Sequence, residues 1–251
     1  MALSWSTRRQ LLYCAVAAVV AVFVLWWGYN AFFNKAPTCR DGVQNGDERG
    51  VDCGGSCALL CAADARAPVV LWSRAFRTDS SHYSAAAYIQ NPNTGAFASG
   101  VRYAFQLFDE DNLLVVERTG TTALPPLPTI PIIEPNIPVG NRSVSRTIFS
   151  FSEVPVWKRA DEENLAYPRA TGVELAPDGA SLSATLVNDS RQDARGVTAV
   201  AVLFDKDGIA RAASRSTLDV PARSRRPVHF TWGFGVAEVV RAEITVLPRV
   251  R

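Results

Sequence analysis

The sequence predicts an all-β ectodomain of two tandem β-sandwiches, which follows one N-terminal transmembrane helix and a small disulfide-rich module. Three observations support this prediction: a long uncharged apolar segment, four cysteines clustered after it, and a strand-and-turn pattern that occurs twice at an offset of 96 residues. The expected boundaries are 1–10 for a cytoplasmic N-terminus, 11–33 for the helix, 34–67 for the module, 68–155 for the first sandwich, 156–170 for a linker and 171–251 for the second sandwich.

The composition of the chain excludes several classes of protein. It has 251 residues, a formal net charge of +2 and 48% hydrophobic residues. This apolar fraction is too high for a disordered chain, and the charge is too close to neutral for a general nucleic-acid binder. The length suffices for one large domain or two small ones.

Residues 11–33 form the predicted membrane span, because they carry no charged residue. As a helix they reach roughly 34 Å, which exceeds the hydrocarbon thickness of about 30 Å. Trp26 and Trp27 lie near one end, where aromatic rings favour the headgroup region. Arg8 and Arg9 precede the span without an acidic neighbour, so the positive-inside rule predicts an N-in/C-out orientation in the cell membrane. A cleaved secretory signal is the alternative, but its apolar stretch is shorter and ends at small residues.

Four cysteines follow the span within 23 residues: Cys39, Cys53, Cys57 and Cys61. An even, clustered number outside the cytoplasm predicts two disulfides that staple a module too small for a core of its own. Three pairings are possible, and the sequence does not choose among them. Zinc is the alternative, since four thiolates complete a tetrahedral site, although the spacing lacks paired C-x2-C motifs.

The residues from Cys39 to Cys57 match the pattern C-x-D-G-x-x-N-x-x-E-x-x-V-D-C-G-G-x-C. This pattern resembles a small extracellular module that accompanies other domains in secreted and surface proteins. The resemblance covers about 23 residues, and the last cysteine spacing is one residue longer than the usual form.

Carboxylate and amide oxygens are dense among the glycines of this module. The favoured interpretation is that these side chains form turns while glycine takes positive φ. A calcium site is the second hypothesis, because calcium prefers such ligands, although the pattern is not an EF-hand. The five candidate ligands are Asp41, Asn45, Asp47, Glu48 and Asp52.

Short apolar runs and frequent turn residues follow residue 67, without a long amphipathic helix, and this texture predicts β-sandwiches. In each copy a strand ends in a polar loop, the next strand ends in Leu-Phe-Asp, and an Asp-rich turn leads into a returning strand. Val101, Tyr103 and Phe105 alternate with polar or small residues, which predicts one buried face. Apart from Thr198, residues 197–204 are apolar on both faces, as in a central strand covered on both sides.

Leu107-Phe108-Asp109 and Leu203-Phe204-Asp205 carry a resemblance to the FxLYD-type immunoglobulin-like domains of prokaryotic envelope proteins. The match covers about 40 residues of each copy. It implies two immunoglobulin-like sandwiches without a characteristic active site. The whole layout is similar to single-pass membrane proteins of bacterial candidate lineages.

Two surfaces are candidates for contact with a partner. Six prolines between residues 125 and 138 exclude a central strand and favour an extended, polyproline-like path. The favoured interpretation is an edge crossover that shields the sandwich rim; the other is an exposed docking segment that begins with Pro125, Pro126 and Pro128. Five arginines and only one aspartate lie between residues 211 and 226. This cluster could bind an anionic polymer, lipid headgroups or an acidic protein face. The alternative is a solvated strand edge. These arginines are Arg211, Arg215, Arg223, Arg225 and Arg226.

The sequence carries no motif of a known catalytic site. It lacks G-x-S-x-G, H-E-x-x-H and a glycine-rich loop ending in Gly-Lys, and its two histidines, His82 and His229, stand alone. Residues 156–170 are expected to form a short helix or a charged linker. We therefore expect a non-catalytic, membrane-anchored extracytoplasmic binding or scaffolding protein, without nucleic acid or small-molecule substrate, whose partner is another envelope protein or a second copy. The alternatives are a structural spacer, a self-assembling envelope component, or a metal-dependent enzyme accessory that uses the Asp-rich turns.

Overall fold

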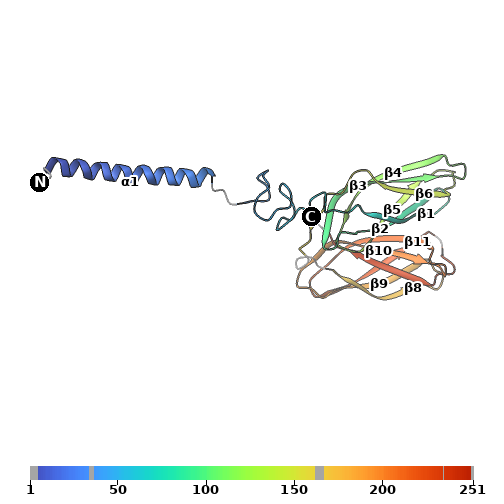
Figure 1. Cartoon of the computed structure of the whole chain (residues 1–251). Coiled ribbons are helices and arrows are strands. Elements are labelled where there is room, and N and C mark those ends of the chain that lie inside the picture. Colours follow the sequence, from blue (N-terminus) through green and yellow to red (C-terminus); the bar gives the residue numbers. More distant parts are fainter. Residues whose placement is uncertain (1–4, 34–36, 162–166, 234, 250–251) are drawn as a thin grey trace. The chain divides into compact units, whose positions relative to one another are not determined.

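The computed structural model describes residues 5–33, 37–161, 167–233 and 235–249 (Figure 1). The chain divides into two compact units, Met1–Cys57 and Ala58–Arg251. The first contains the helix and most of the cysteine-rich module, and the second contains the named strands.

The helix α1 spans Trp5–Phe33 and contains the predicted span 11–33. It is long and apolar enough to cross a membrane, judged by length and composition. Large apolar side chains such as Leu25 and Trp27 are exposed along it. A helix that exposes apolar residues in this way requires a lipid or protein environment.

The second unit is built from strands. They are β1 (Val69–Arg77), β2 (His82–Gln90), β3 (Ala96–Phe108), β4 (Leu114–Leu124), β5 (Thr129–Pro138), β6 (Arg146–Phe151), β7 (Lys158–Arg159), β8 (Arg169–Leu175), β9 (Ser181–Asn188), β10 (Ala194–Phe204), β11 (Ala210–Val220), β12 (Ser224–Thr231) and β13 (Arg241–Leu247). The predicted class, mostly β with one N-terminal apolar helix and disulfide-bonded cysteines, is confirmed.

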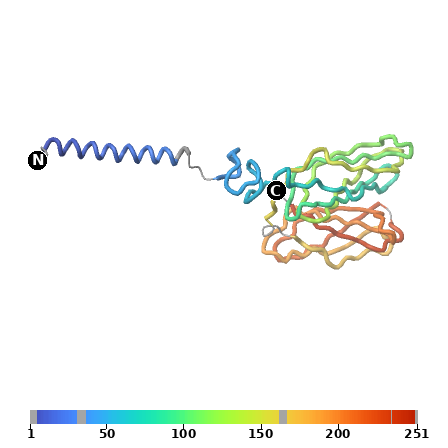
Figure 2. The backbone as a smooth tube through the Cα atoms, viewed as in Figure 1, coloured from blue at the N-terminus to red at the C-terminus, as the bar shows by residue number. Residues whose placement is uncertain are grey.

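The strands form two sets of antiparallel sheets with the same topology. The first repeat, β1 to β6, has the sheets β1-β2-β5 and β4-β3-β6, and the second repeat, β8 to β13, has the sheets β12-β9-β8 and β11-β10-β13. The short strand β7 pairs with β3. Each strand of the first repeat therefore has a counterpart in the second. Figure 2 traces the backbone from the first repeat, coloured teal to yellow, to the second, coloured orange to red.

The repeat extends to the pairing register. β3 and β4 pair with Ala98 opposite Leu124, and β10 and β11 pair with Ala194 opposite Val220. Two irregularities interrupt each hairpin, and those in the second hairpin lie 96 residues after those in the first. The offset found in the sequence is thus also an offset of strand geometry.

Three apolar clusters hold the second unit together. One contains residues of both sheets of the first repeat, and another contains residues of both sheets of the second. The third lies between the repeats and joins residues of β1-β2-β5 to residues of β11-β10-β13. The four sheets consequently follow one another as layers, with β1-β2-β5 and β11-β10-β13 in the middle (Figure 1).

The burial of β3 and β10 confirms the alternation read from the sequence. In β3, Tyr103 and Phe105 are buried and Arg102 is exposed. In β10, Ala199 and Leu203 belong to the core of the second repeat, whereas the even-numbered apolar residues face the cluster between repeats. A strand covered on both faces needs no polar side, and this explains its continuous apolar sequence.

Aromatic rings form the centre of the contact between repeats. Trp72 and Tyr88 stack at 4.6 Å, and the ring of Phe204 meets both edge-on. The Tyr88 hydroxyl donates a hydrogen bond to Glu243 at 3.2 Å. Burial, and then the charge of Glu243, raises the pKa of Tyr88.

The predicted linker, residues 156–170, begins inside the fold. Trp157 is 2% exposed and belongs to the core of the first repeat. Its carbonyl accepts a hydrogen bond from the Leu60 amide at 2.9 Å, and Leu59 bridges Lys158. Residues 156–159 therefore form neither a short helix nor a free linker, and residues 162–166 lie outside the described residues. The same contacts explain why residues 58–61 belong to the second unit, although the module was expected to reach residue 67.

Candidate functional site

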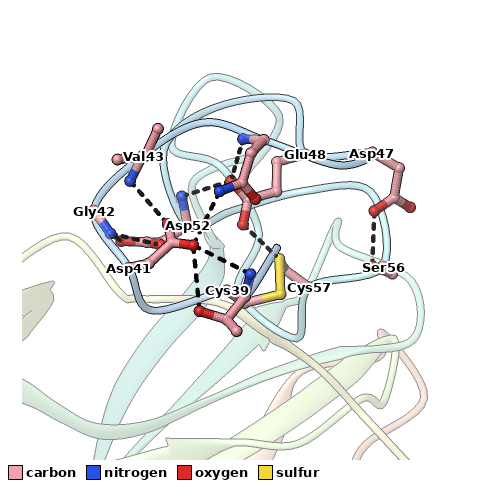
Figure 3. Close-up of a disulfide and its surroundings, with 11 residues drawn as sticks. Cys39, Asp41, Gly42, Val43, Asp47, Glu48, Asp52, Ser56 and Cys57 are labelled. Atoms are coloured by element: carbon pink, nitrogen blue, oxygen red, sulfur yellow. Dashed lines mark hydrogen bonds between the residues drawn. A yellow bond between two sulfur atoms is a disulfide. The ribbon is translucent and has the colours of Figure 1, made fainter. Parts of the chain in front are cut away.

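Disulfides hold the cysteine-rich module. Cys39 and Cys57 form a disulfide (Figure 3), and Cys53 and Cys61 are also disulfide-bonded. Cys14, in α1, is a free cysteine. The prediction of disulfides is confirmed, and the zinc alternative is wrong because the four sulfurs are not thiolates. Glu48 lies beside Cys39 and Cys57 in an arrangement that could hold a metal, but the joined sulfurs remove two of its three ligands.

The acidic residues of the module order its backbone. The Asp41 carboxylate accepts hydrogen bonds from the Val43 amide at 3.0 Å and the Asn45 side chain at 2.9 Å. The Asn45 bond, followed by the Val43 bond, lowers the pKa of Asp41. Asp52 accepts the Gly42 amide at 3.0 Å (Figure 3). The Asp41–Val43 contact is that of a side-chain turn, whereas the Asp52–Gly42 contact joins two distant parts of the loop.

Glu48 and Asp47 complete this network. One Glu48 oxygen accepts the amides of Asn45 and Asp52 at 3.3 Å, and Asp47 accepts the Ser56 hydroxyl at 2.8 Å. The buried Asn45 Oδ1 has no hydrogen-bond partner among the described residues. Calcium at these five residues stays a prediction.

Gly55 is required in the Cys-Gly-Gly-Ser-Cys segment. Its φ is +55°, a region that side chains other than glycine rarely adopt. A Cβ added there would lie 2.0 Å from the Asp47 carbonyl oxygen. The second glycine between the cysteines thus lets two stretches of backbone approach closely.

The two Asp-rich hairpin turns are built alike. Asp205 Oδ1 accepts the amides of Asp207 and Ile209, both at 2.9 Å, and its other oxygen pairs with Arg211 at 2.6 Å. The equivalent residue in the first repeat, Asp109, accepts the amides of Asp111 and Leu113 and pairs with Arg142 at 2.6 Å. In both turns the carboxylate closes the hairpin, as the turn interpretation predicts.

Stability should decrease in acid because of these two turns. The Arg142 bond is the largest cause that lowers the pKa of Asp109, and the Ile209 amide is the largest for Asp205. A carboxyl with a lowered folded pKa contributes fully above its unfolded pKa of about 3.9, and the contribution is lost as the pH falls through the folded value. We expect the Tm of the full-length protein to decrease when the pH is lowered below about 4.

The matched variant is Asp205→Asn, which keeps the shape of the side chain and removes its charge. Its Tm should lie below that of the parent at pH 7, and the difference should shrink as the pH is lowered. A difference that stays constant from pH 7 to about pH 2 would contradict a role for the ionised carboxylate.

The structure separates the five arginines of the predicted partner surface. Arg211 pairs with Asp205, and Arg215 donates a hydrogen bond to the Ile133 carbonyl at 3.0 Å, so both are used inside the second unit. Arg223 and Arg225 line a hollow of about 400 Å³ at the turn between β11 and β12. Arg226 is exposed and lies outside this lining.

A sixth arginine, Arg191, lines the same hollow, and sequence reasoning missed it. Arg191, Arg223 and Arg225, here named the arginine hollow, have no salt bridge in the described part of the chain. Asp189, the acidic residue beside them, pairs with Arg169 at 3.0 Å. The sequence signal that could have indicated Arg191 was the asparagine-containing turn that occurs in both repeats. In the second repeat this turn, residues 188–192, lies at the end of β11.

A buried asparagine fixes the two loops that carry the arginine hollow. Asn188 is 1% exposed, and its side-chain amide donates to the carbonyls of Gln192 at 2.8 Å and Val220 at 2.9 Å. The Arg223 amide donates to the Ser190 carbonyl at 3.1 Å. The site is therefore positioned by a hydrogen-bonded framework and not by a free loop.

The proline-rich segment lies at the edge of a sheet, as the interpretation as an edge crossover expects. Residues 129–138 form β5, an edge strand, where missing amide donors are tolerated. Pro125 is buried, Pro126 is partly buried and Pro128 is exposed. A role of these prolines in docking stays a prediction.

Comparisons with known proteins assign no family. No protein family and no curated protein matches the chain. Among solved structures, a mutant of Bacillus subtilis oxalate decarboxylase OxdC aligns with 86% of this chain and 89% of its own, at 10% identity and a TM-score of 0.11. This likeness is too weak to carry an argument about fold or function.

Proposed function

We propose that the chain is a membrane-anchored, extracytoplasmic binding or scaffolding protein without catalytic activity. In this proposal α1 spans the cell membrane, residues 1–10 are cytoplasmic, and the two repeats are immunoglobulin-like β-sandwiches outside. The disulfide-bonded cysteines support an oxidising compartment after the helix, and Arg8 and Arg9 support the orientation.

The arginine hollow carries the proposal of binding. The guanidinium groups of Arg191 and Arg223 on the two loops and of Arg225 on β12 share one hollow, where like charges repel and an anionic group offsets the repulsion. Guanidinium groups recognise carboxylates through two parallel hydrogen bonds. The partner that suits this site is an acidic segment of another envelope protein.

Self-assembly through the contact between repeats is less well supported. A further copy would have to add to the outer face of β4-β3-β6 or of β12-β9-β8. The first face carries Arg102 and Gln106, and the second carries Ser183 and Thr185. Neither presents the apolar surface of the cluster between the repeats.

The contacts of the Asp-rich turns support a structural role in closing the hairpins more directly than a role in binding a metal. In each turn the first aspartate accepts two backbone amides and pairs with an arginine. These contacts satisfy the carboxylate with donors of the chain itself.

The test is in-cell crosslinking of tagged full-length protein, followed by mass spectrometry. A double variant, Arg191→Glu with Arg225→Glu, should lower recovery of the crosslinked partner about tenfold. The matched control is Arg159→Glu with Arg226→Glu, which makes the same change in net charge at exposed residues outside the hollow.

Retained partner recovery in the control, with equal Tm values for both variants, would support the proposal. Undiminished recovery in the Arg191/Arg225 variant would contradict the arginine hollow as the partner site. Crosslinks to the chain itself and to no other protein would instead favour the structural alternative.

A further inference from the structure

A second hollow of about 400 Å³ lies between the two repeats, away from the residues that line the arginine hollow. Residues of β4 and β5 form one side of it, and residues of β10, β11 and the segment after β13 form the other. We call it the inter-repeat cleft. Its volume lies within the range of about 300–1,000 Å³ that is usual for small-ligand sites, which favour such domain boundaries.

The inter-repeat cleft is positively charged. Arg215 and Arg249 line it, and none of its lining residues is acidic. Arg215 gives one hydrogen bond to the Ile133 carbonyl at 3.0 Å, which holds the guanidinium across the two repeats and leaves its other donors without a carboxylate. Glu134 follows Ile133 in β5 but engages Arg118, at 3.8 Å, and the Tyr103 hydroxyl.

The rest of the lining combines hydroxyl groups with aliphatic surface. Four threonines contribute hydroxyls, and those of Thr198 and Thr217 lie 3.3 Å apart. Ile132, Val200 and Leu247 contribute apolar surface. Hydroxyl groups both donate and accept hydrogen bonds, so they suit a ligand that carries hydroxyls of its own.

We propose that the inter-repeat cleft binds an acidic sugar. The carboxylate pairs with Arg215 and Arg249, the sugar hydroxyls exchange hydrogen bonds with the threonines, and the C–H face of the ring lies on the aliphatic surface. Free uronic acids and acidic residues of an envelope polysaccharide share this chemistry.

The features of β5 favour a sugar over an acidic peptide. A peptide that adds to a sheet edge needs free amides and carbonyls along that edge. On the β5 side of the cleft Pro131 has no amide hydrogen, and the Ile133 carbonyl already accepts from Arg215. The edge is therefore a poor template for a peptide strand.

The experiment is calorimetric titration of the full-length protein in detergent, with D-glucuronate as the probe and D-glucose as the neutral control. Glucuronate should bind with a Kd of roughly 1 mM or below, and glucose should not bind measurably. Arg249→Ala should weaken glucuronate binding about tenfold, because it removes one of the two guanidinium groups that pair with the carboxylate. Arg249 is exposed, so its loss should leave the fold intact. Arg226→Ala is the matched control and should bind as the parent does.

A titration with trigalacturonate distinguishes the two sources of the ligand, a free uronic acid and an acidic polysaccharide. Tighter binding than glucuronate supports a polysaccharide, and equal binding supports the free acid. The proposal is overturned if glucuronate does not bind, if glucose binds equally well, or if an oligoglutamate peptide displaces glucuronate from the cleft. The Arg191→Glu/Arg225→Glu variant should still bind glucuronate, so failure here is distinct from failure of the partner site.

Discussion

Replacing Phe204 by alanine should weaken the contact between the two repeats and lower the free energy of unfolding by about 3–5 kcal/mol. The Phe204 side chain is buried between the middle sheets, and its ring meets both Trp72 and Tyr88 edge-on. Removal leaves a cavity that the stacked Trp72 and Tyr88 cannot fill. We expect urea unfolding, followed by tryptophan fluorescence, to change from one transition to two as the repeats unfold separately.

The repeat supplies a matched control for this variant. Phe108 occupies the equivalent position 96 residues earlier, and the guanidinium of Arg146 lies over its ring at 4.9 Å, as Arg241 lies over Phe204 at 4.4 Å. Phe108 is partly exposed, so Phe108→Ala should cost much less. Equal losses in the two variants would contradict the role of Phe204 in joining the repeats.

Replacing Trp157 by alanine should have an effect of similar size on the first repeat. Trp157 is almost fully buried and closes the core of that repeat beside Leu60. The expected loss is about 3–5 kcal/mol, because truncation of a buried aromatic side chain combines lost burial with a cavity. The measurement is the urea midpoint of the unfolding transition, followed by circular dichroism because the variant lacks a tryptophan.

Val156→Ala is the control, since this neighbouring side chain is 63% exposed. It should change the free energy of unfolding by no more than about 0.5 kcal/mol. If Trp157→Ala were as mild as Val156→Ala, residues 156–159 would behave as the free linker that the sequence led us to expect.

The local structure of the chain could be predicted where a residue's role depends on its neighbours in sequence. The alternation in β3, the apolar β10 and the clustered cysteines are of this kind, and all are visible as patterns with a period or a spacing. The pairing of Cys39 with Cys57 was left open, because three pairings fit the same spacing.

The arginine hollow could be predicted only in part, because nearness in sequence is a poor guide to nearness on a sheet. Arg211 and Arg215 lie on β11, whereas Arg225 and Arg226 lie on β12, which belongs to a different sheet. Arg191 reaches the hollow from a separate loop. The sequence also did not reveal that the sheet β1-β2-β5 covers the second face of β10, because tertiary packing and not a local pattern determines this contact.

The stacking of the repeats through different sheets makes the second unit a head-to-tail assembly of two members. Such a heterologous contact does not close on itself, and in identical units it would continue into a filament. The residues equivalent to Val200 and Val202 on the outer sheet β4-β3-β6 are Ala104 and Gln106. That face therefore lacks the branched apolar side chains against which a third unit of this kind would pack.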